Sequence, residues 1–192
     1  MLHVEDQIRK LAALATVALM ATAEALAQEK SARPSRRIIV SIPDRKLVLL
    51  QGDRVVKIYD TAVGALRSPS PAGSFQIVNH VEHPTWYTKG KIVPPGKSNP
   101  LGTRWMGLSR KGYGIHGTNV PSSIGRNASH GCIRMRNRDV EELFEMVSVG
   151  DEVDLVAERT PELERILPPT LNATALSARS EVALLAAPFS AQ

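Results

Sequence analysis

Two side chains with complementary chemistry stand sixteen residues apart in this chain of 192 residues, His116 and Cys132. Cys132 is the only cysteine, so an internal disulfide is not possible. A thiol with an ordinary pKa of about 8.5 is mostly protonated at neutral pH. It needs a nearby imidazole to take its proton or to hold the thiolate as an ion pair. We therefore predict that Cys132 is a nucleophile and His116 its general base.

The residues around Cys132 suit the transfer of an acyl group. Ser129, His130 and Gly131 precede it directly, and Arg134 follows two residues later, on the same face of the chain if this stretch is extended. Gly131 would let backbones pack closely and would leave N–H groups free to face a developing oxyanion. The guanidinium of Arg134 is suited to hold a substrate carboxylate with two hydrogen bonds.

A metal site is the alternative use of these residues. Nitrogen and sulfur ligands of the kinds that zinc prefers are supplied by His80, His83, His116, His130 and Cys132. However, there is no second cysteine, and no acidic ligand motif adjoins His80-x-x-His83. We predict no metal and no cofactor.

The overall composition is that of a globular protein with a modest basic excess. Hydrophobic residues make up 43% and charged residues 22%, which argues against disorder throughout, and the formal net charge is +5. This charge suits an anionic surface such as a cell envelope. No Lys/Arg block of five occurs and aromatic residues make up only 4%, so a nucleic-acid partner is not expected.

The first 27 residues have the layout of a secretory signal peptide. Arg9 and Lys10 precede an uncharged apolar run at 11–23, and Ala25-Leu26-Ala27 forms a small-x-small cleavage site. The apolar run is short for a membrane span, so we expect export and no stable span after cleavage. Acidic residues near the start are unusual for such a peptide, and an uncleaved anchor stays open.

Beyond a polar linker at 28–36, alternating apolar residues predict a mostly β domain over residues 37–157. Short turns join the first strands, which favours an antiparallel meander. We expect strands at 38–42, 45–50, 55–63, 74–78, 105–109, 113–116 and 153–157. Residues 89–101 hold three prolines and two glycines and are predicted to be a long loop.

One helix is clearly indicated near the end of this domain. Val140, Leu143, Phe144 and Val147 lie at helical spacing and form a single apolar face, with Asn137 as the expected N-cap. The tail at 158–192 is broken by prolines and rich in alanine. We expect it to be poorly ordered or loosely helical, and assign it no function.

Several segments resemble the YkuD-type L,D-transpeptidases (the ErfK/YbiS/YcfS/YnhG-like group). The strongest are His116-Gly117-Thr118, then Ser129-His130-Gly131-Cys132-Ile133-Arg134-Met135, then Asn137-x-Asp139. Segments 70–75 and 99–105 are also similar, so the resemblance covers about residues 37–157. It implies a single β-sandwich or barrel-like domain with one or two helices.

The resemblance also implies a role for each residue. Cys132 would be the nucleophile, and His116 the base, oriented by the carbonyl of Gly117. Ser129, His130 and Gly131 would surround the oxyanion, and Arg134 would contact the donor. The donor would be a peptidoglycan stem peptide, attacked at its third residue with release of terminal D-Ala through a thioester.

The acceptor of the acyl group stays open at this point. It would be the amine of a second stem, an envelope protein or water, and with water the enzyme would be an L,D-carboxypeptidase. A non-catalytic envelope-binding domain in which Cys132 is idle is the remaining alternative. The expected location is the periplasm or cell envelope, and the oligomeric state is left open.

Overall fold

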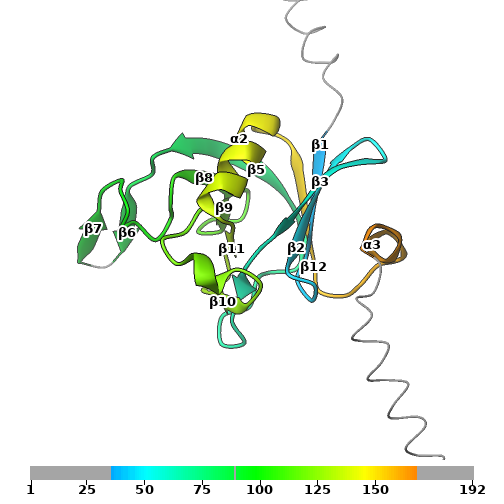
Figure 1. Cartoon of the computed structure of the whole chain (residues 1–192), viewed down its shortest axis with the longest axis horizontal. Helices are drawn as coiled ribbons and strands as arrows, with labels where there is room; N and C mark the ends of the chain where they lie inside the picture. The colour runs from blue at the N-terminus through cyan, green and yellow to red at the C-terminus, as the bar shows by residue number, and fades with distance from the viewer. Residues whose placement is uncertain (1–35, 89, 168–192) are drawn as a thin grey trace, which may run out of the picture. The chain divides into compact units, whose positions relative to one another are not determined.

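The computed structural model describes residues 36–88 and 90–167, and its main feature is one curled sheet of eight strands (Figure 1). In order of hydrogen-bonded neighbours, the strands are β11 (Ile133–Arg134), β9 (Gly114–His116), β8 (Arg104–Leu108), β5 (Gly73–Glu82), β12 (Glu152–Val156), β1 (Arg36–Ser41), β2 (Lys46–Gln51) and β3 (Arg54–Asp60). Segments distant in the sequence are therefore neighbours in the sheet. Strand β9, which carries His116, and strand β11, which directly follows Cys132, lie at one end of this order.

Strands β1, β2 and β3 form the antiparallel meander that their short turns predict. Ile38 lies opposite Leu49 and Val40 opposite Leu47, and all four side chains are fully buried in the main core. Ile39 points to the other face of β1, where a smaller apolar cluster covers it. Burial on both faces explains why β1 is apolar at nearly every position.

A short contact between its two ends closes the sheet. Ala62, two residues after β3, exchanges two backbone hydrogen bonds of 2.9 Å with Arg134 in β11. Two small strand pairs flank the closed sheet. They are parallel β4 (Val63–Gly64) with β10 (Asn127–Ser129), and antiparallel β6 (Trp86–Thr88) with β7 (Lys91–Val93). The predicted mostly β, barrel-like fold is confirmed.

Helix α2 (Asn137–Met146) is the helix that the apolar spacing predicts. Val140, Leu143 and Val147 are buried in the main core, and Phe144 packs against it. The expected N-cap is wrong by one residue. Arg136 is the N-cap, with extended backbone angles, and Asn137 is the first helical residue, whose side chain bonds outside the helix. A short 3₁₀ helix, η1 (Pro121–Ser123), precedes β10.

Two segments contain regular structure at positions that the sequence did not specify. The predicted loop at 89–101 contains β7, which pairs with β6 just before it to form a hairpin. The start of the predicted tail forms helix α3 (Pro161–Ile166), which Thr160 caps by accepting a hydrogen bond from the backbone N–H of Leu163. Leu163 and Leu167 pack on the outer face of β1 and β2, so tertiary packing stabilises a helix too short to show a periodic pattern.

The predicted signal peptide, most of the linker and residues 168–192 lie outside the described residues. Within the described ranges, none of the helices has the length and apolar character needed to cross a membrane.

Candidate active site

The pairing of β9 with β11 brings His116 and Cys132 to the same part of the sheet. The two strands are parallel, with Ile133 opposite Ile115 and Arg134 opposite His116. Both isoleucines are fully buried in the main core. Neighbouring residues in a strand point to opposite faces, so His116 and Arg134 face away from that core. Cys132 lies in the turn directly before β11, two residues from Arg134. Diagonal neighbours on adjacent strands lie within reach of an aromatic side chain.

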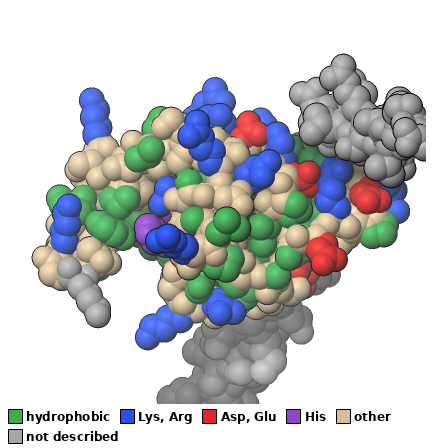
Figure 2. All heavy atoms as spheres, turned by 90° about the horizontal axis from the view of Figure 1, so that it is seen from below, with side chains coloured by type: hydrophobic (Ala, Val, Ile, Leu, Met, Phe, Trp, Pro, Cys, Tyr) green, Lys and Arg blue, Asp and Glu red, His purple; other side chains and the backbone are tan. Residues whose placement is uncertain are grey.

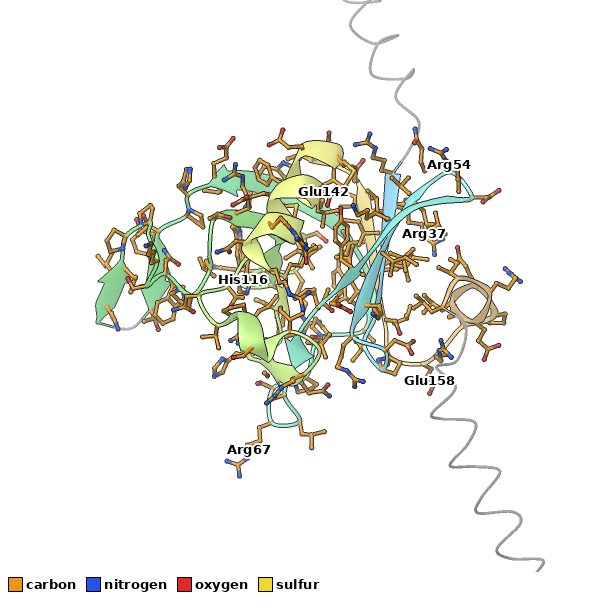
Figure 3. All side chains as sticks on the ribbon, viewed as in Figure 1. Arg37, Arg54, Arg67, His116, Glu142 and Glu158 are labelled. Atoms are coloured by element: carbon orange, nitrogen blue, oxygen red, sulfur yellow. The ribbon has the colours of Figure 1, made fainter. Side chains whose placement is uncertain are left out.

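The imidazole of His116 is held in a defined orientation. Its Nδ1 lies 2.6 Å from the carbonyl oxygen of Gly117. A carbonyl can only accept, so Nδ1 carries the proton and Nε2 of the neutral ring is free to accept one. Trp105, the cross-strand partner of His116 on β8, stacks on the ring with centroids 5.7 Å apart. In Figure 3, the labelled His116 lies beneath α2.

A glycine makes room for this stacking. A Cβ on Gly114 would come within 2.6 Å of the Trp105 ring, closer than real Cβ contacts allow. Because Gly114 has no side chain, the indole of Trp105 can cover both Gly114 and His116. His116 is only 4% exposed as a result.

Cys132 lies in the turn that leads into β11 and is partly exposed. Its thiol donates a hydrogen bond to the carbonyl oxygen of Gly112, with Sγ 3.6 Å from that oxygen. Gly112 belongs to the turn between β8 and β9, so the sulfur is held against the strand that carries His116. The described residues place the thiol at the surface of the domain rather than in its core.

Burial keeps both groups neutral. Desolvation lowers the pKa of His116 to about 4, against the opposing effect of the Gly117 and Leu101 carbonyls, and the positive charge of Arg134 lowers it further. Desolvation also raises the pKa of the Cys132 thiol, while a backbone hydrogen bond at Gly114 and the charge of Arg134 act to lower it. The resting pair is therefore a neutral thiol and a neutral imidazole.

The lowered pKa of His116 predicts how stability depends on pH. The folded value of about 4 lies below the ordinary 6.5, so the unfolded chain binds the proton more readily. This contribution to stability is complete above pH 6.5 and is lost as pH falls towards 4. We expect the free energy of unfolding to drop by about 3 kcal/mol from this group over that range. Urea unfolding at several pH values would measure it.

A His116→Gln variant is the matched control, because glutamine keeps polar atoms and cannot titrate. Its free energy of unfolding should lack this part of the decline below pH 6.5. The same decline in both proteins would show that His116 is not the group responsible.

Ser129 shapes the turn that precedes the sulfur. Its Oγ donates to the carbonyl oxygen of Cys132 at 2.5 Å and accepts from the backbone N–H of Gly131 at 3.0 Å. The expectation of a free N–H at Gly131 is therefore wrong: that group is bonded within the turn. Gly131 has a φ of +110°, and a Cβ there would come within 2.7 Å of the Tyr113 ring. Both facts restrict the position to glycine.

The other predicted site residues lie around this turn. Arg134 is half-buried, and its charge acts on both His116 and Cys132. His130 is exposed beside Gly131. Among the described residues, none accepts a hydrogen bond from the backbone N–H of Cys132, which leaves that donor available.

Asn137 is a further residue of the site whose role sequence reasoning missed. Its Oδ1 accepts a hydrogen bond of 3.0 Å from the backbone N–H of Thr118, two residues after His116. A Cβ added to Gly102 or to Gly117 would overlap the same oxygen. Asn137 thus ties the start of α2 to the end of β9. The sequence signal was its place in the motif, which we interpreted as a helix cap.

Removing this contact should destabilise the fold. In an Asn137→Ala variant, the N–H of Thr118, a residue only 4% exposed, would lose its partner. An unsatisfied buried donor costs about 1–3 kcal/mol, so we expect a loss of this size in the free energy of unfolding from urea denaturation. Asn137→Asp retains an acceptor oxygen at the same position and should lose less. Equal losses would show that the hydrogen bond is not the cause.

The histidines of the metal alternative are not gathered into one site. Among residues 36–88 and 90–167, no group of three or more His, Cys, Asp or Glu side chains is arranged to hold a metal ion. The ring of His80 instead packs on Phe144, with centroids 4.4 Å apart. His116 is committed to Gly117 through Nδ1.

The fold and the site together define a class: a curled β domain with a histidine and the single cysteine of the chain at one end of its sheet. Comparison with known proteins gives this class a family. The model of the YkuD family, described as the L,D-transpeptidase catalytic domain, matches residues 35–155. The chain therefore belongs to the YkuD family of L,D-transpeptidases.

Individual relatives agree with this assignment. A Bacillus licheniformis protein named as the L,D-transpeptidase YkuD is 45% identical over 119 residues, or 62% of this chain and 64% of that protein. Among solved structures, the carbamoyl form of the Ldtfm enzyme with avibactam is 26% identical, with a TM-score of 0.56, over 65% of this chain and 50% of that one.

An Enterococcus faecium L,D-transpeptidase variant is 25% identical, with a TM-score of 0.55, over 64% of this chain and 50% of its own. The chain thus spans slightly less than two thirds of the first Bacillus relative and about half of these two solved chains. These relatives are L,D-transpeptidases, which are enzymes.

Proposed function

We propose that this chain is an exported L,D-transpeptidase that uses Cys132 as nucleophile and His116 as general base on peptidoglycan stem peptides. The observation that carries the proposal is the β9–β11 register. It sets Arg134 opposite the neutral, oriented imidazole of His116, while the single thiol lies in the turn before β11 and bonds to Gly112 in the turn before β9. Family membership supports the reaction class.

The first half-reaction would form a thioester. Nε2 of His116 takes the thiol proton as Sγ of Cys132 attacks the carbonyl carbon of the third stem residue. The bond from that carbon to the nitrogen of the terminal D-Ala breaks, and the leaving amine takes the proton from His116. A neutral resting pair suits general-base catalysis, since the ring is already deprotonated at neutral pH.

Two groups of the site would stabilise the charge that develops on the carbonyl oxygen. The N–H of Cys132 is the donor left without a partner among the described residues, while that of Gly131 is bonded to Ser129. Ser129 would act through the shape of the turn, and His130 would flank the oxyanion. Arg134, half-buried opposite His116, would hold a carboxylate of the donor stem.

In the second half-reaction, an amine would attack the thioester carbonyl and release the thiol. His116 would take a proton from this amine and return one to sulfur. The amine of a second stem would give a cross-link, and that of an envelope protein would give an anchored protein. Water in the same place would give an L,D-carboxypeptidase.

The cell compartment is part of the proposal. The segment at 1–27 supports export through its basic start, apolar run and Ala-x-Ala site. Stem peptides lie outside the cytoplasmic membrane, so the substrate and the proposed location agree. A solved relative is a carbamoyl enzyme formed with avibactam. This covalent adduct supports the proposal that the chain also reacts through a covalent intermediate.

Product analysis would test the function. The purified chain would be incubated with a disaccharide tetrapeptide and an amine acceptor, and products would be followed by mass spectrometry. We expect free D-Ala and cross-linked product in equal amounts. D-Ala release without cross-linking would assign a carboxypeptidase. No D-Ala release at all would leave the non-catalytic envelope-binding domain and overturn the proposal.

A further inference from the structure

The charges of this chain are strongly segregated along the sequence, which the modest net charge conceals. Between Asp60 and Asp139, residues 61–138 contain eleven Lys and Arg but only one acid, Glu82. Residues 139–167 have the opposite bias, with ten Asp and Glu against two arginines. The basic segment contains every residue proposed for catalysis, and the acidic segment contains most of α2, β12 and α3.

The structure keeps this segregation in space. In Figure 2, the acidic side chains visible on this face all lie in its right-hand half, the side on which β12 and α3 lie in Figure 1. The left-hand half shows lysines, arginines and a histidine without acids. On this face, the acidic side chains therefore lie apart from the cations of the left-hand half.

Three segments that carry basic residues adjoin the turn that holds Cys132. The loop at 65–70 carries Arg67 and contacts the Cys132 turn through Ser68, whose Oγ donates to the carbonyl of Ser129 at 3.4 Å. The loop at 109–113 carries Arg110 and Lys111, next to the Gly112 carbonyl that accepts from the thiol. The segment at 126–131 runs from Arg126 directly into the turn. These four side chains, which we call the basic rim, are all exposed.

The cations of the rim are not neutralised within the described part of the protein. In that part, Asp and Glu form ion pairs with Arg37, Lys57, Arg136 and Arg159 but with none of the four rim residues. Arg110 instead lies over the Tyr113 ring, at 5.1 Å from its centroid. Figure 3 shows Arg67 extending away from the sheet at the periphery. The rim thus presents positive charge without an acidic partner in the described ranges, on loops that adjoin the Cys132 turn.

We propose that the basic rim binds carboxylates of wall stems neighbouring the one that reacts, so that the enzyme selects polymeric wall over free stem peptides. This inference rests on the proposed function. Because the loops that carry the rim adjoin the Cys132 turn, a wall polymer bound there can also present a reactive stem to the sulfur. An anionic polymer without stem peptides would block the site and supply no substrate, so it is a less suitable ligand. Arginines pair well with carboxylates, and several weak contacts to one polymer add through multivalency.

Binding can be measured without catalysis by using the Cys132→Ala protein and sedimenting it with purified sacculi free of phosphate polymers. Adding Arg67→Gln and Arg126→Gln should weaken binding roughly ten-fold at low salt, from two exposed ion pairs. The loss should shrink as salt is raised, since exposed charges are screened. Arg110 is left intact because it packs on Tyr113.

The matched control is Arg54→Gln with Arg165→Gln in the same background. Both are exposed arginines outside the basic segment, without an ion pair in the described part of the chain, and the change in net charge is the same. We expect this control to bind sacculi as the parent does. If the two double variants weakened binding equally, net charge alone would explain the effect, and the proposal would be overturned.

Chemical modification of the sacculi tests whether the rim binds their carboxylates. The protein should no longer sediment with sacculi whose carboxylates have been converted to amides. Unchanged binding to amidated sacculi, or tighter retention by anionic lipid vesicles than by native sacculi, would overturn the assignment. These measurements use inactive protein, so a failure of the rim is separable from a failure of the transpeptidase proposal, which product analysis tests with the unmodified chain.

Discussion

A Cys132→Ala variant should form no acyl-enzyme and release no D-Ala, because the chain contains no other thiol to replace the nucleophile. Intact-protein mass spectrometry after exposure to a tetrapeptide stem or a carbapenem would check this. The unmodified chain should gain one covalent adduct, and the variant none. An adduct on the variant, or continued turnover, would contradict the assignment of the nucleophile.

The loss must be separated from misfolding. Cys132 is partly exposed and its thiol donates a weak hydrogen bond to the carbonyl of Gly112, so its removal should cost little stability. We expect the variant to unfold within about 1 kcal/mol of the parent, since large losses arise from core or buried polar sites. A Cys132→Ser variant serves as a second control, because a hydroxyl matches the thiol in shape but is a weaker nucleophile.

The second large effect is expected at His116. Replacement by alanine removes the proton acceptor, and general-base catalysis is typically worth about 10²–10⁴-fold in rate. We expect the rate of acylation, followed by D-Ala release in a single turnover, to fall by this factor. The free thiol should still react slowly at high pH, where the thiolate forms without help.

The pH profile distinguishes this role from a structural one. Because the pKa of the buried imidazole is about 4, the acylation rate of the unmodified chain should not decline at pH 6.5 as it would with an ordinary histidine. In His116→Ala, the rate should instead rise with the thiolate fraction. His83→Asn is the control, since His83 is exposed and its φ of +48° suits asparagine. A similar loss of acylation rate in His83→Asn would show that the effect at His116 does not report a general base.

The fold was predictable where one segment contains the whole signal. The meander of β1, β2 and β3 follows from alternating residues and short turns, and α2 follows from the spacing of Val140, Leu143 and Val147. The hairpin of β6 and β7 was missed because prolines and glycines next to it indicate a loop. For the tail we expected poor order or loose helix, but the bounds of helix α3 could not be predicted, because six residues carry no periodic pattern. Leu163 and Leu167 stabilise this helix by packing on a distant part of the sheet.

The candidate site was also predictable only in part. The sequence by itself determined which groups can do chemistry: one thiol, a histidine sixteen residues before it, an arginine two residues after it, and a basic segment that holds all three. Asn137 was visible in the motif, but its partner Thr118 lies nineteen residues earlier, in the loop that follows β9. Only the folded chain joins them.

Tertiary structure alone decided how these groups act on one another. The β9–β11 register depends on burying Ile115 and Ile133 in one core, and this packing turns His116 and Arg134 to the opposite face. Stacking by Trp105 and the resulting desolvation then lower the pKa of the imidazole. Residue types and spacing are local properties of the chain. Strand pairing and burial are set by contacts between distant segments, and they determine both the position and the protonation of the proposed catalytic pair.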